Sequence, residues 1–226
     1  MMKRIVLWML SCFLCGVMNA QHQQIFDEYR ESAGDYAQLF SGKIERGYSP
    51  SFYTNHPYWP SGEFVQGDVV YNGLLYREVM LRYDVFMNQL VVRSSKKMSN
   101  VCVPMHLVGK FTLEGTDYVP RNGVFMTVLF SGRNLELVES MHIVMKERMV
   151  DNVKIMYEFE RCLKYYVLRD GIMHEVDKLK SVQKLFPDFK KNLKAFAKQR
   201  ELDFEKRRRV SLQSIIGYVH ELLTQP

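Results

Sequence analysis

Short runs of β-branched and aromatic residues, separated by turn residues, fill the chain from residue 63 to residue 175. Each run has the length of a strand, and turn residues separate successive runs, which is typical of consecutive β-strands. The connections are too short for parallel crossovers, which need a dozen residues or more, so antiparallel pairing is favoured. The pattern excludes an all-helical fold and predicts a long antiparallel meander of about 7–10 strands.

One hairpin of this meander is defined by its turn. Asn72-Gly73 separates two apolar runs, and Asn-Gly supplies the two positive φ values of a type I′ turn. After it, Val79, Leu81 and Tyr83 alternate with polar residues, as a half-buried strand requires. Further strands are predicted at residues 90–92, 105–113, 124–130, 135–146, 153–158 and 162–168.

The hydrophobic period becomes helical after Val176. Ser181 can cap a short helix, Asp188 can cap a second, and a third begins at about Asp203. The apolar stripe of the second helix consists of Phe189, Leu193, Phe196 and Ala197. The fold class predicted is therefore α+β: a curved sheet or partly open barrel, followed by two or three helices that pack on it.

The first twenty residues have the pattern of a secretory signal peptide. A basic start at residues 1–4 precedes an apolar stretch, and we expect cleavage after Ala20. Lipoprotein processing is the competing interpretation, but Cys12 has Leu10 at −2, where a small residue is needed, and Cys15 follows Phe13-Leu14. Of the 226 residues, 206 then remain, and none of their apolar runs reaches the ~18 residues of a transmembrane helix. With 47% hydrophobic residues, a chain of this length can form a core, which excludes disorder.

Charge divides the chain near residue 177. Residues 21–177 hold 17 Lys and Arg against 20 Asp and Glu, a net charge of −3, whereas residues 178–226 hold 12 against 5, a net charge of +7. We therefore predict three parts: a signal peptide at 1–20, a β-rich body at 21–177 that begins with an aromatic arm, and a basic helical segment at 178–226 packed on the body.

The sequence beyond residue 20 contains no familiar catalytic or cofactor motif. A Gly-x-Ser-x-Gly elbow, a His-Glu-x-x-His helix, a phosphate-binding glycine loop and a Cys-x-x-Cys pair are all missing there. Cys102 and His106 come closest to a catalytic pair, but Pro104 interrupts the strand between them and a packing role is favoured. We expect a protein without enzymatic activity, cofactor or metal.

Aromatic residues and prolines are interspersed between residues 48 and 60, in a segment that cannot form a regular helix. Tyr53, Tyr58 and Trp59 are candidate binding residues, either as a stacking platform for sugar rings or as a plug in a partner's groove. The interpretation that we favour is that this arm covers an apolar face or an open edge of the sheet.

The predicted second helix carries a basic face formed by Lys190, Lys191, Lys194 and Lys198. Such a face can bind an anionic membrane surface or an acidic polymer. We expect no nucleic acid partner for an exported protein. The favoured alternative is that the apolar stripe packs on the sheet and the lysines are solvated.

Two cysteines remain after the signal, Cys102 and Cys162. In an oxidising compartment the pair can form a disulfide. Both residues lie in apolar, strand-like surroundings, so the favoured alternative is two small buried thiols.

Six stretches spread over the chain carry a resemblance: residues 36–43, 55–59, 67–76, 79–84, 164–166 and 184–188. Together they resemble a group of poorly characterised exported proteins and receptor-associated domains of Bacteroidota. The resemblance implies a location in a Gram-negative envelope, in the periplasm or at the outer membrane, and it carries no catalytic residues.

These observations favour a non-enzymatic envelope protein that binds a protein partner through an exposed strand edge or through the aromatic arm. Such a protein can be an accessory subunit of an outer-membrane transport or assembly complex. The alternative is a glycan- or lipid-binding module of the periplasm or the cell surface, which the clustered tyrosines and Trp59 indicate.

Overall fold

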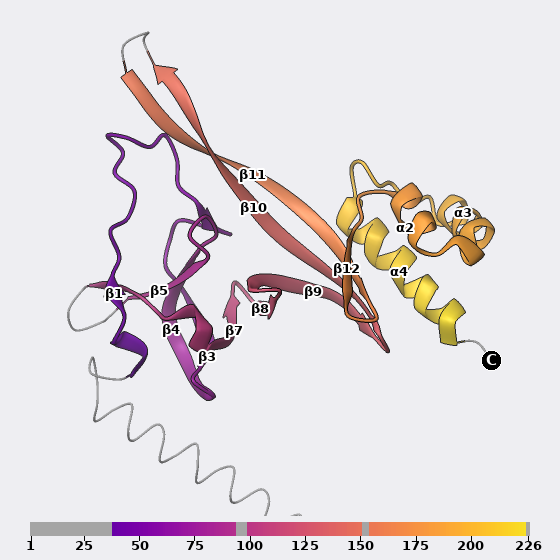
Figure 1. Ribbon diagram of the computed structural model, residues 1–226, viewed down its shortest axis with the longest axis horizontal. Coiled ribbons are helices and arrows are strands. Elements are labelled where there is room, and N and C mark those ends of the chain that lie inside the picture. The colour runs from indigo at the N-terminus through magenta and orange to yellow at the C-terminus, as the bar shows by residue number, and fades with distance from the viewer. Residues whose placement is uncertain (1–37, 94–98, 151–153, 225–226) are drawn as a thin grey trace, which may run out of the picture.

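The computed structural model describes residues 38–93, 99–150 and 154–224 (Figure 1). The predicted signal peptide at 1–20, with Cys12 and Cys15, lies outside these ranges. Within them, twelve strands form one antiparallel sheet, and three α-helices follow it. The predicted α+β fold is confirmed: a long meander in a curved, unclosed sheet, followed by helices, with more strands than the turn spacing indicated.

The strands are β1 (Lys43–Ile44), β2 (Tyr58–Trp59), β3 (Val65–Tyr71), β4 (Leu74–Asp84), β5 (Gln89–Arg93), β6 (Asn100–Cys102), β7 (Val108–Leu113), β8 (Thr116–Arg121), β9 (Val124–Gly132), β10 (Leu135–Val150), β11 (Lys154–Arg169) and β12 (Ile172–Glu175). The helices are α2 (Leu179–Leu185), α3 (Lys190–Gln199) and α4 (Arg208–Thr224), with 3₁₀ turns η2 (Gln38–Phe40), η3 (Met105–Leu107) and η4 (Pro187–Phe189). The sheet order is β1-β6-β5-β4-β3-β7-β8-β9-β10-β11-β12, and β2 pairs with β4.

Two-residue turns close several hairpins, as predicted at Asn72-Gly73. Asn72 has a φ of 50° and Gly73 a φ of 77°, which are the positive values that a type I′ turn needs. The pairs Glu114-Gly115, Asn122-Gly123 and Asp170-Gly171 also have positive φ at both residues. Because a two-residue turn connects the last paired residues of the two strands directly, it fixes the register of the hairpin that it closes.

β8 is a strand that the sequence analysis missed. Its run contains Pro120, and proline argues against a strand inside a sheet because it lacks a ladder N–H. β7 pairs only with residues 116–118 of β8, whereas Pro120 is opposite Phe125 of β9. The proline nitrogen therefore lies beyond Tyr118, the last residue of β8 that pairs with β7. No hydrogen bond of the β7–β8 ladder is lost there.

β11 corrects a second expectation. Two strands were predicted, at 153–158 and 162–168, but the structure has one strand of 16 residues that pairs with β10 along its whole length. Glu160 and Arg161 between the predicted strands are exposed. These charged residues lie in a solvent-exposed part of one continuous strand, and the strand is not interrupted there.

The two largest apolar clusters among the described residues hold the fold together. The first is formed mainly by strands β3–β9 and is rich in aromatic residues, including the buried Tyr71, Tyr83 and Phe111. The second lies between the β10–β11 hairpin and the helices, where Leu137 of β10 packs with residues such as Ile215 of α4. The helical segment therefore packs on the part of the sheet formed by β9, β10 and β11 (Figure 1).

The helix starts differ in detail from the prediction. Ser181 is the third residue of α2, and its Oγ binds the backbone of the two residues that precede the helix. Asp188 lies in η4 and does not cap α3. Asp203 accepts two backbone N–H groups in a turn, so α4 begins five residues later than predicted, at Arg208.

Candidate functional site

The β10–β11 hairpin extends beyond the rest of the sheet (Figure 1). β9 pairs with β10 only at residues 135–139, and β12 pairs with β11 only at residues 166–169. The remainder, residues 140–150 and 154–165, is a two-stranded ribbon that we call the distal hairpin. β10 is exposed there from residue 144 to residue 149. A long strand pair with so little cover is the most conspicuous surface feature of the fold.

The two faces of the distal hairpin differ in chemistry, because directly opposite side chains share a face and successive ones alternate. The apolar face, as we call it, consists of Met141, Ile143, Met145, Met149, Ile155, Tyr157, Phe159 and Leu163, with Glu147 and Arg161 among them. The other face carries the ion pairs Lys146–Glu160, at 2.7 Å, and Arg148–Glu158, at 3.1 Å. Met149 is 65% exposed, so the apolar face is open at its outer end.

The backbone of β10 is unpaired along one side of the distal hairpin. The N–H of Tyr157 donates to the carbonyl of Phe52, and the carbonyl of Tyr157 accepts from the N–H of Thr54, so both groups point away from β10. In an antiparallel ladder the opposite residue, Glu147, also points its N–H and C=O away from the pair. Every second residue of β10 does the same. Among the described residues, β10 has no strand partner on this side beyond Glu139. The open edge, as we call it, consists of Ile143, Met145, Glu147 and Met149.

The arm, residues 45–57, covers the other edge of this hairpin. The side chain of Asn55 mimics a strand: its amide donates to the carbonyl of Phe159 at 2.9 Å, and its oxygen accepts the N–H of Phe159 at 2.8 Å. The guanidinium of Arg161 donates to the carbonyls of His56 and Tyr58. The arm thus protects the edge of β11, which is the covering role that the sequence analysis favoured.

An aromatic cluster joins the arm to β11. Phe159 is 2% exposed and contacts three rings. Tyr53 stacks on it with a centroid distance of 5.5 Å, Tyr48 approaches edge-on at 5.1 Å, and Phe86 lies at 5.3 Å. Each such pair stabilises by ~0.5–1.5 kcal/mol beyond its buried area, so the cluster fixes the arm in place.

The three predicted binding residues do not form one platform. Tyr53 has a ring face against Phe159. Tyr58 is 4% exposed, and the guanidinium of Arg82 lies 3.9 Å from the centre of its ring. Trp59 is in β2 and packs against the first apolar cluster. All three rings are engaged by contacts within the chain.

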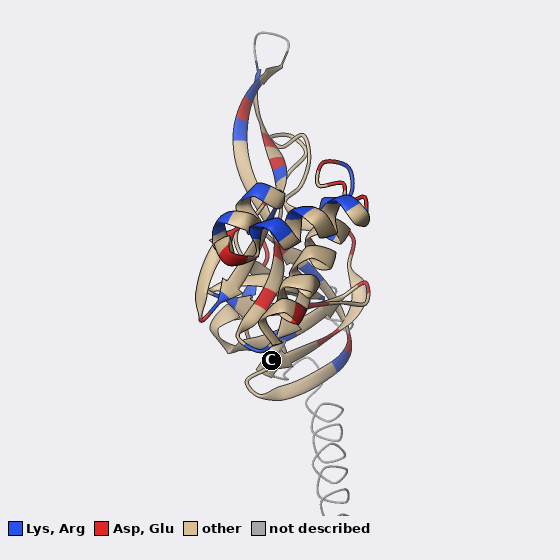
Figure 2. Ribbon diagram, turned by 90° about the vertical axis from the view of Figure 1, so that its right-hand side faces the viewer, with Lys and Arg blue, Asp and Glu red and all other residues tan. Residues whose placement is uncertain are grey.

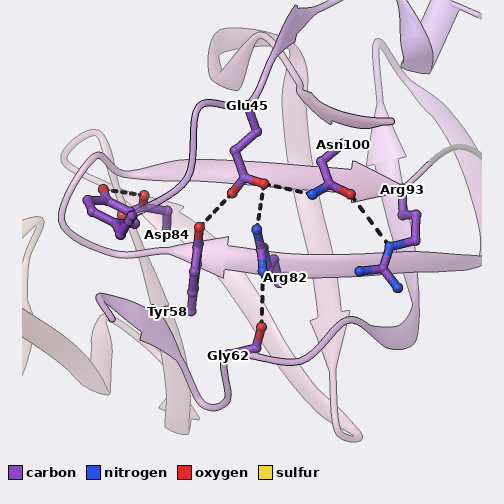
Figure 3. Close-up of polar contacts among 8 residues, drawn as sticks. Glu45, Tyr58, Gly62, Arg82, Asp84, Arg93 and Asn100 are labelled. Atoms are coloured by element: carbon purple, nitrogen blue, oxygen red, sulfur yellow. Dashed lines mark hydrogen bonds and ion pairs between the residues drawn. The ribbon is translucent and has the colours of Figure 1, made fainter. Parts of the chain in front are cut away.

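Glu45 fixes the beginning of the arm to β4 (Figure 3). Its carboxylate accepts hydrogen bonds from the hydroxyl of Tyr58 at 2.8 Å, from the amide of Asn100 at 3.0 Å, and from the guanidinium of Arg82. Arg82 also donates to the carbonyl of Gly62. Only 7% of the Glu45 side chain and 14% of the Arg82 side chain are exposed. These charges are tolerated in the interior because each has an opposite charge and further hydrogen bonds.

Asp84 lies on the same part of the sheet and lines a cavity of about 370 Å³ together with Tyr48 and Met87. Its carboxylate accepts the hydroxyl of Tyr48 at 2.7 Å and the N–H of Met87 at 2.9 Å. Burial raises the pKa of Asp84 and also that of Tyr48. Among the described residues, no group of three His, Cys, Asp or Glu is placed to hold a metal ion.

Asp84→Asn is expected to change how stability depends on pH. The pKa of folded Asp84 lies above its ordinary value of 3.8, so the folded state binds this proton more tightly than the unfolded state. Asp84 therefore lowers the free energy of unfolding as the pH rises from that ordinary value through the folded-state pKa. Asparagine is neutral, and its amide can still form hydrogen bonds with the hydroxyl of Tyr48 and the N–H of Met87. In urea unfolding between about pH 3 and 7, the variant should gain stability relative to the wild type as the pH rises.

Asp117→Asn is the matched control with the opposite sign. The hydrogen bond from Lys110 lowers the pKa of Asp117, so this carboxylate contributes stability that is lost as the pH falls through the folded-state pKa. The control variant should lose stability relative to the wild type as the pH rises. If Asp84→Asn follows the wild type at every pH, burial does not perturb Asp84 as described.

The two cysteines are free, so the disulfide considered from the sequence is not formed. Cys102 is buried in β6. Cys162 is exposed, opposite His142, on the face of the distal hairpin that carries the ion pairs. The expectation of two buried thiols therefore holds for Cys102 alone. Burial raises the pKa of the Cys102 thiol to about 11, which is the reverse of an activated nucleophile, and His106 is exposed in η3.

The basic face of α3 is exposed at all four predicted positions: Lys190, Lys191, Lys194 and Lys198. On the other side of the helix, Leu193 and Ala197 are buried, and Phe196 stacks on Tyr218 of α4 with a centroid distance of 4.1 Å. The apolar stripe of α3 therefore packs within the protein, in part against α4, and the four lysines face solvent.

The open edge was not among the predicted site residues. A signal exists in residues 141–149, where Met, Ile, Met, Glu and Met alternate with His, Val, Lys and Arg, a strand pattern with one apolar face. That pattern does not reveal where the neighbouring strand β9 ends. No local sequence pattern indicates the contact between Glu45 and Arg82, because the two residues are 37 positions apart.

Comparisons of the chain with models of protein families, with curated proteins and with solved structures found no match. No helix in the described part of the chain is both long and apolar enough to cross a membrane.

Proposed function

We propose that this protein binds a protein partner by adding a strand of that partner to the open edge of β10. One observation carries the proposal: alternate residues from Ile143 to Met149 direct unpaired backbone groups outward, while β11 holds the strand from the other side. A strand with a free row of N–H and C=O groups is a template for another chain. In strand addition these main-chain hydrogen bonds supply the affinity, and alternate side chains supply the specificity.

The side chains beside the open edge indicate the chemistry of the partner. Every second residue of an added strand would lie beside Met145 and Met149 on the apolar face. The residues between would lie beside Lys146 and Arg148, which remain 57% and 62% exposed although each has a glutamate partner. A segment that alternates apolar and acidic residues fits both faces. Because the arm already covers β11, addition is directed to β10.

The setting of this activity is the cell envelope, in an accessory subunit of an outer-membrane transport or assembly complex, without catalysis. The predicted signal at residues 1–20 and the lack of catalytic motifs in the sequence support this role. The glycan-binding alternative has less support, because the rings of Tyr53, Tyr58 and Trp59 are engaged within the chain.

Photo-crosslinking from the apolar face tests the proposal. With p-benzoylphenylalanine in place of Met149, irradiation of cells that make the protein is expected to give one predominant protein adduct. The cross-linked peptide of the partner should be an extended, alternating segment. Ile172 on β12 is a matched control, because it is 62% exposed against 65% for Met149. Adducts in equal yield at both positions, or at neither, contradict the proposal.

A further inference from the structure

We infer that the exposed lysines of α2 and α3 attach this protein to an anionic phospholipid surface. The lysine surface, as we call it, consists of Lys180, Lys184, Lys190, Lys191, Lys194 and Lys198, all of which are exposed. In the described part of the chain, the ion pairs of the helical segment involve only Lys178 and Arg209. The six lysines of the surface therefore keep their full charge toward solvent. Figure 2 shows these basic segments gathered along the outer helices.

The geometry of α3 determines the mode of attachment. By the helical period of 100° per residue, its four lysines fall within an arc of about 100°. The apolar residues of the helix are used elsewhere, since Leu193 and Ala197 are buried and Phe196 stacks on Tyr218. No apolar stripe is left to insert into the acyl chains. Binding is therefore electrostatic, at the level of the head groups, and must weaken steeply with salt.

A flat anionic surface fits this arrangement better than a single acidic chain does. The lysines are spread over two neighbouring helices, α2 and α3 (Figure 2), and a membrane is broad enough to contact both helices. The distal hairpin projects away from the helices (Figure 1). Attachment through the lysine surface consequently leaves the open edge accessible, and the two activities are independent.

Vesicle co-sedimentation tests the inference on the chain from residue 21, which contains every described residue. Wild-type protein should bind vesicles of phosphatidylcholine with about 30% phosphatidylglycerol, bind phosphatidylcholine alone weakly, and dissociate at about 0.5 M NaCl. Reversing Lys190, Lys191, Lys194 and Lys198 to glutamate should lower the partition constant by ~100-fold or more. Neutralising the same four lysines with glutamine should give a smaller loss of binding.

The matched control reverses four exposed cations outside the helices: Lys43, Arg46, Arg133 and Lys154. It changes the net charge by the same amount and should lower binding far less. Equal losses in both quadruple variants would show a net-charge effect and overturn the inference. Equal binding to both vesicle types, no binding to either, or retention on an acidic polymer without binding to vesicles would overturn it as well. Thermal unfolding of each variant confirms that the comparison is between folded proteins.

Discussion

Replacement of Arg82 by methionine is expected to lower the free energy of unfolding by about 3–5 kcal/mol. The change removes the cation and leaves the carboxylate of Glu45, which is 7% exposed on its side chain, with only the neutral donors Tyr58 and Asn100. A buried charge that has lost its partner is the costly case. The guanidinium also stacks on Tyr58 and Phe64, at 3.9 and 4.4 Å from the ring centres, and methionine replaces these contacts only in part.

Urea unfolding followed by the fluorescence of Trp59 measures this loss. Trp59 is the one tryptophan beyond residue 20 and lies in β2, next to Tyr58. The control is Arg121→Met, which breaks an ion pair with Glu136 whose side chains are 30% and 26% exposed. The control should cost about 1 kcal/mol or less. If the two variants lose equal stability, the network around Glu45 does not anchor the arm.

The class of fold could be predicted because its signals are local. Asn72-Gly73 specifies a hairpin turn through its own backbone preferences, and apolar residues at helical spacing, such as Leu193 and Phe196, identify the helices. Two of the differences among the strands arose because tertiary context overrode a local sequence rule. Pro120 is tolerated because the pairing of β8 with β7 ends at Tyr118, and Glu160 continues a strand because that part of the hairpin lies in water.

The candidate site could be predicted only in part. The arm and its tyrosines were recognised, and the favoured covering role agrees with the structure. Their contacts depend on residues far along the chain: Asn55 binds Phe159, 104 positions away. The open edge depends on the length of β10 relative to β9, which pairs with it only as far as Glu139. A local sequence pattern reveals neither the contact between Asn55 and Phe159 nor the residue of β10 at which the pairing with β9 ends. Neither could therefore be inferred from the sequence.

Glu147→Pro is expected to lower the affinity for the protein partner by about 10- to 100-fold. The N–H of Glu147 faces the open edge, so proline removes one hydrogen bond to an added strand and leaves a carbonyl of the partner unsatisfied. Such an unsatisfied group costs about 1–3 kcal/mol, which corresponds to that loss of affinity. This N–H does not belong to the ladder between β10 and β11, so the hairpin keeps its pairing.

Glu147→Ala is the matched control, because it removes the same side chain and charge but keeps the N–H. It should retain the affinity of the wild type. Thermal unfolding of the proline and alanine variants should differ little, since position 147 is exposed and lies on an edge. A proline variant that unfolds far earlier would show that its N–H serves the hairpin itself, which contradicts the assignment of the open edge.

The most direct test of strand addition combines this pair with photo-crosslinking from Met149. The yield of the partner adduct is measured in the wild-type, Glu147→Ala and Glu147→Pro backgrounds, in proteins with matching unfolding curves. Strand addition predicts equal adducts in the first two and a loss of at least about 10-fold in the third. Equal adducts in all three backgrounds would contradict it, because the partner would then be bound without the backbone of β10.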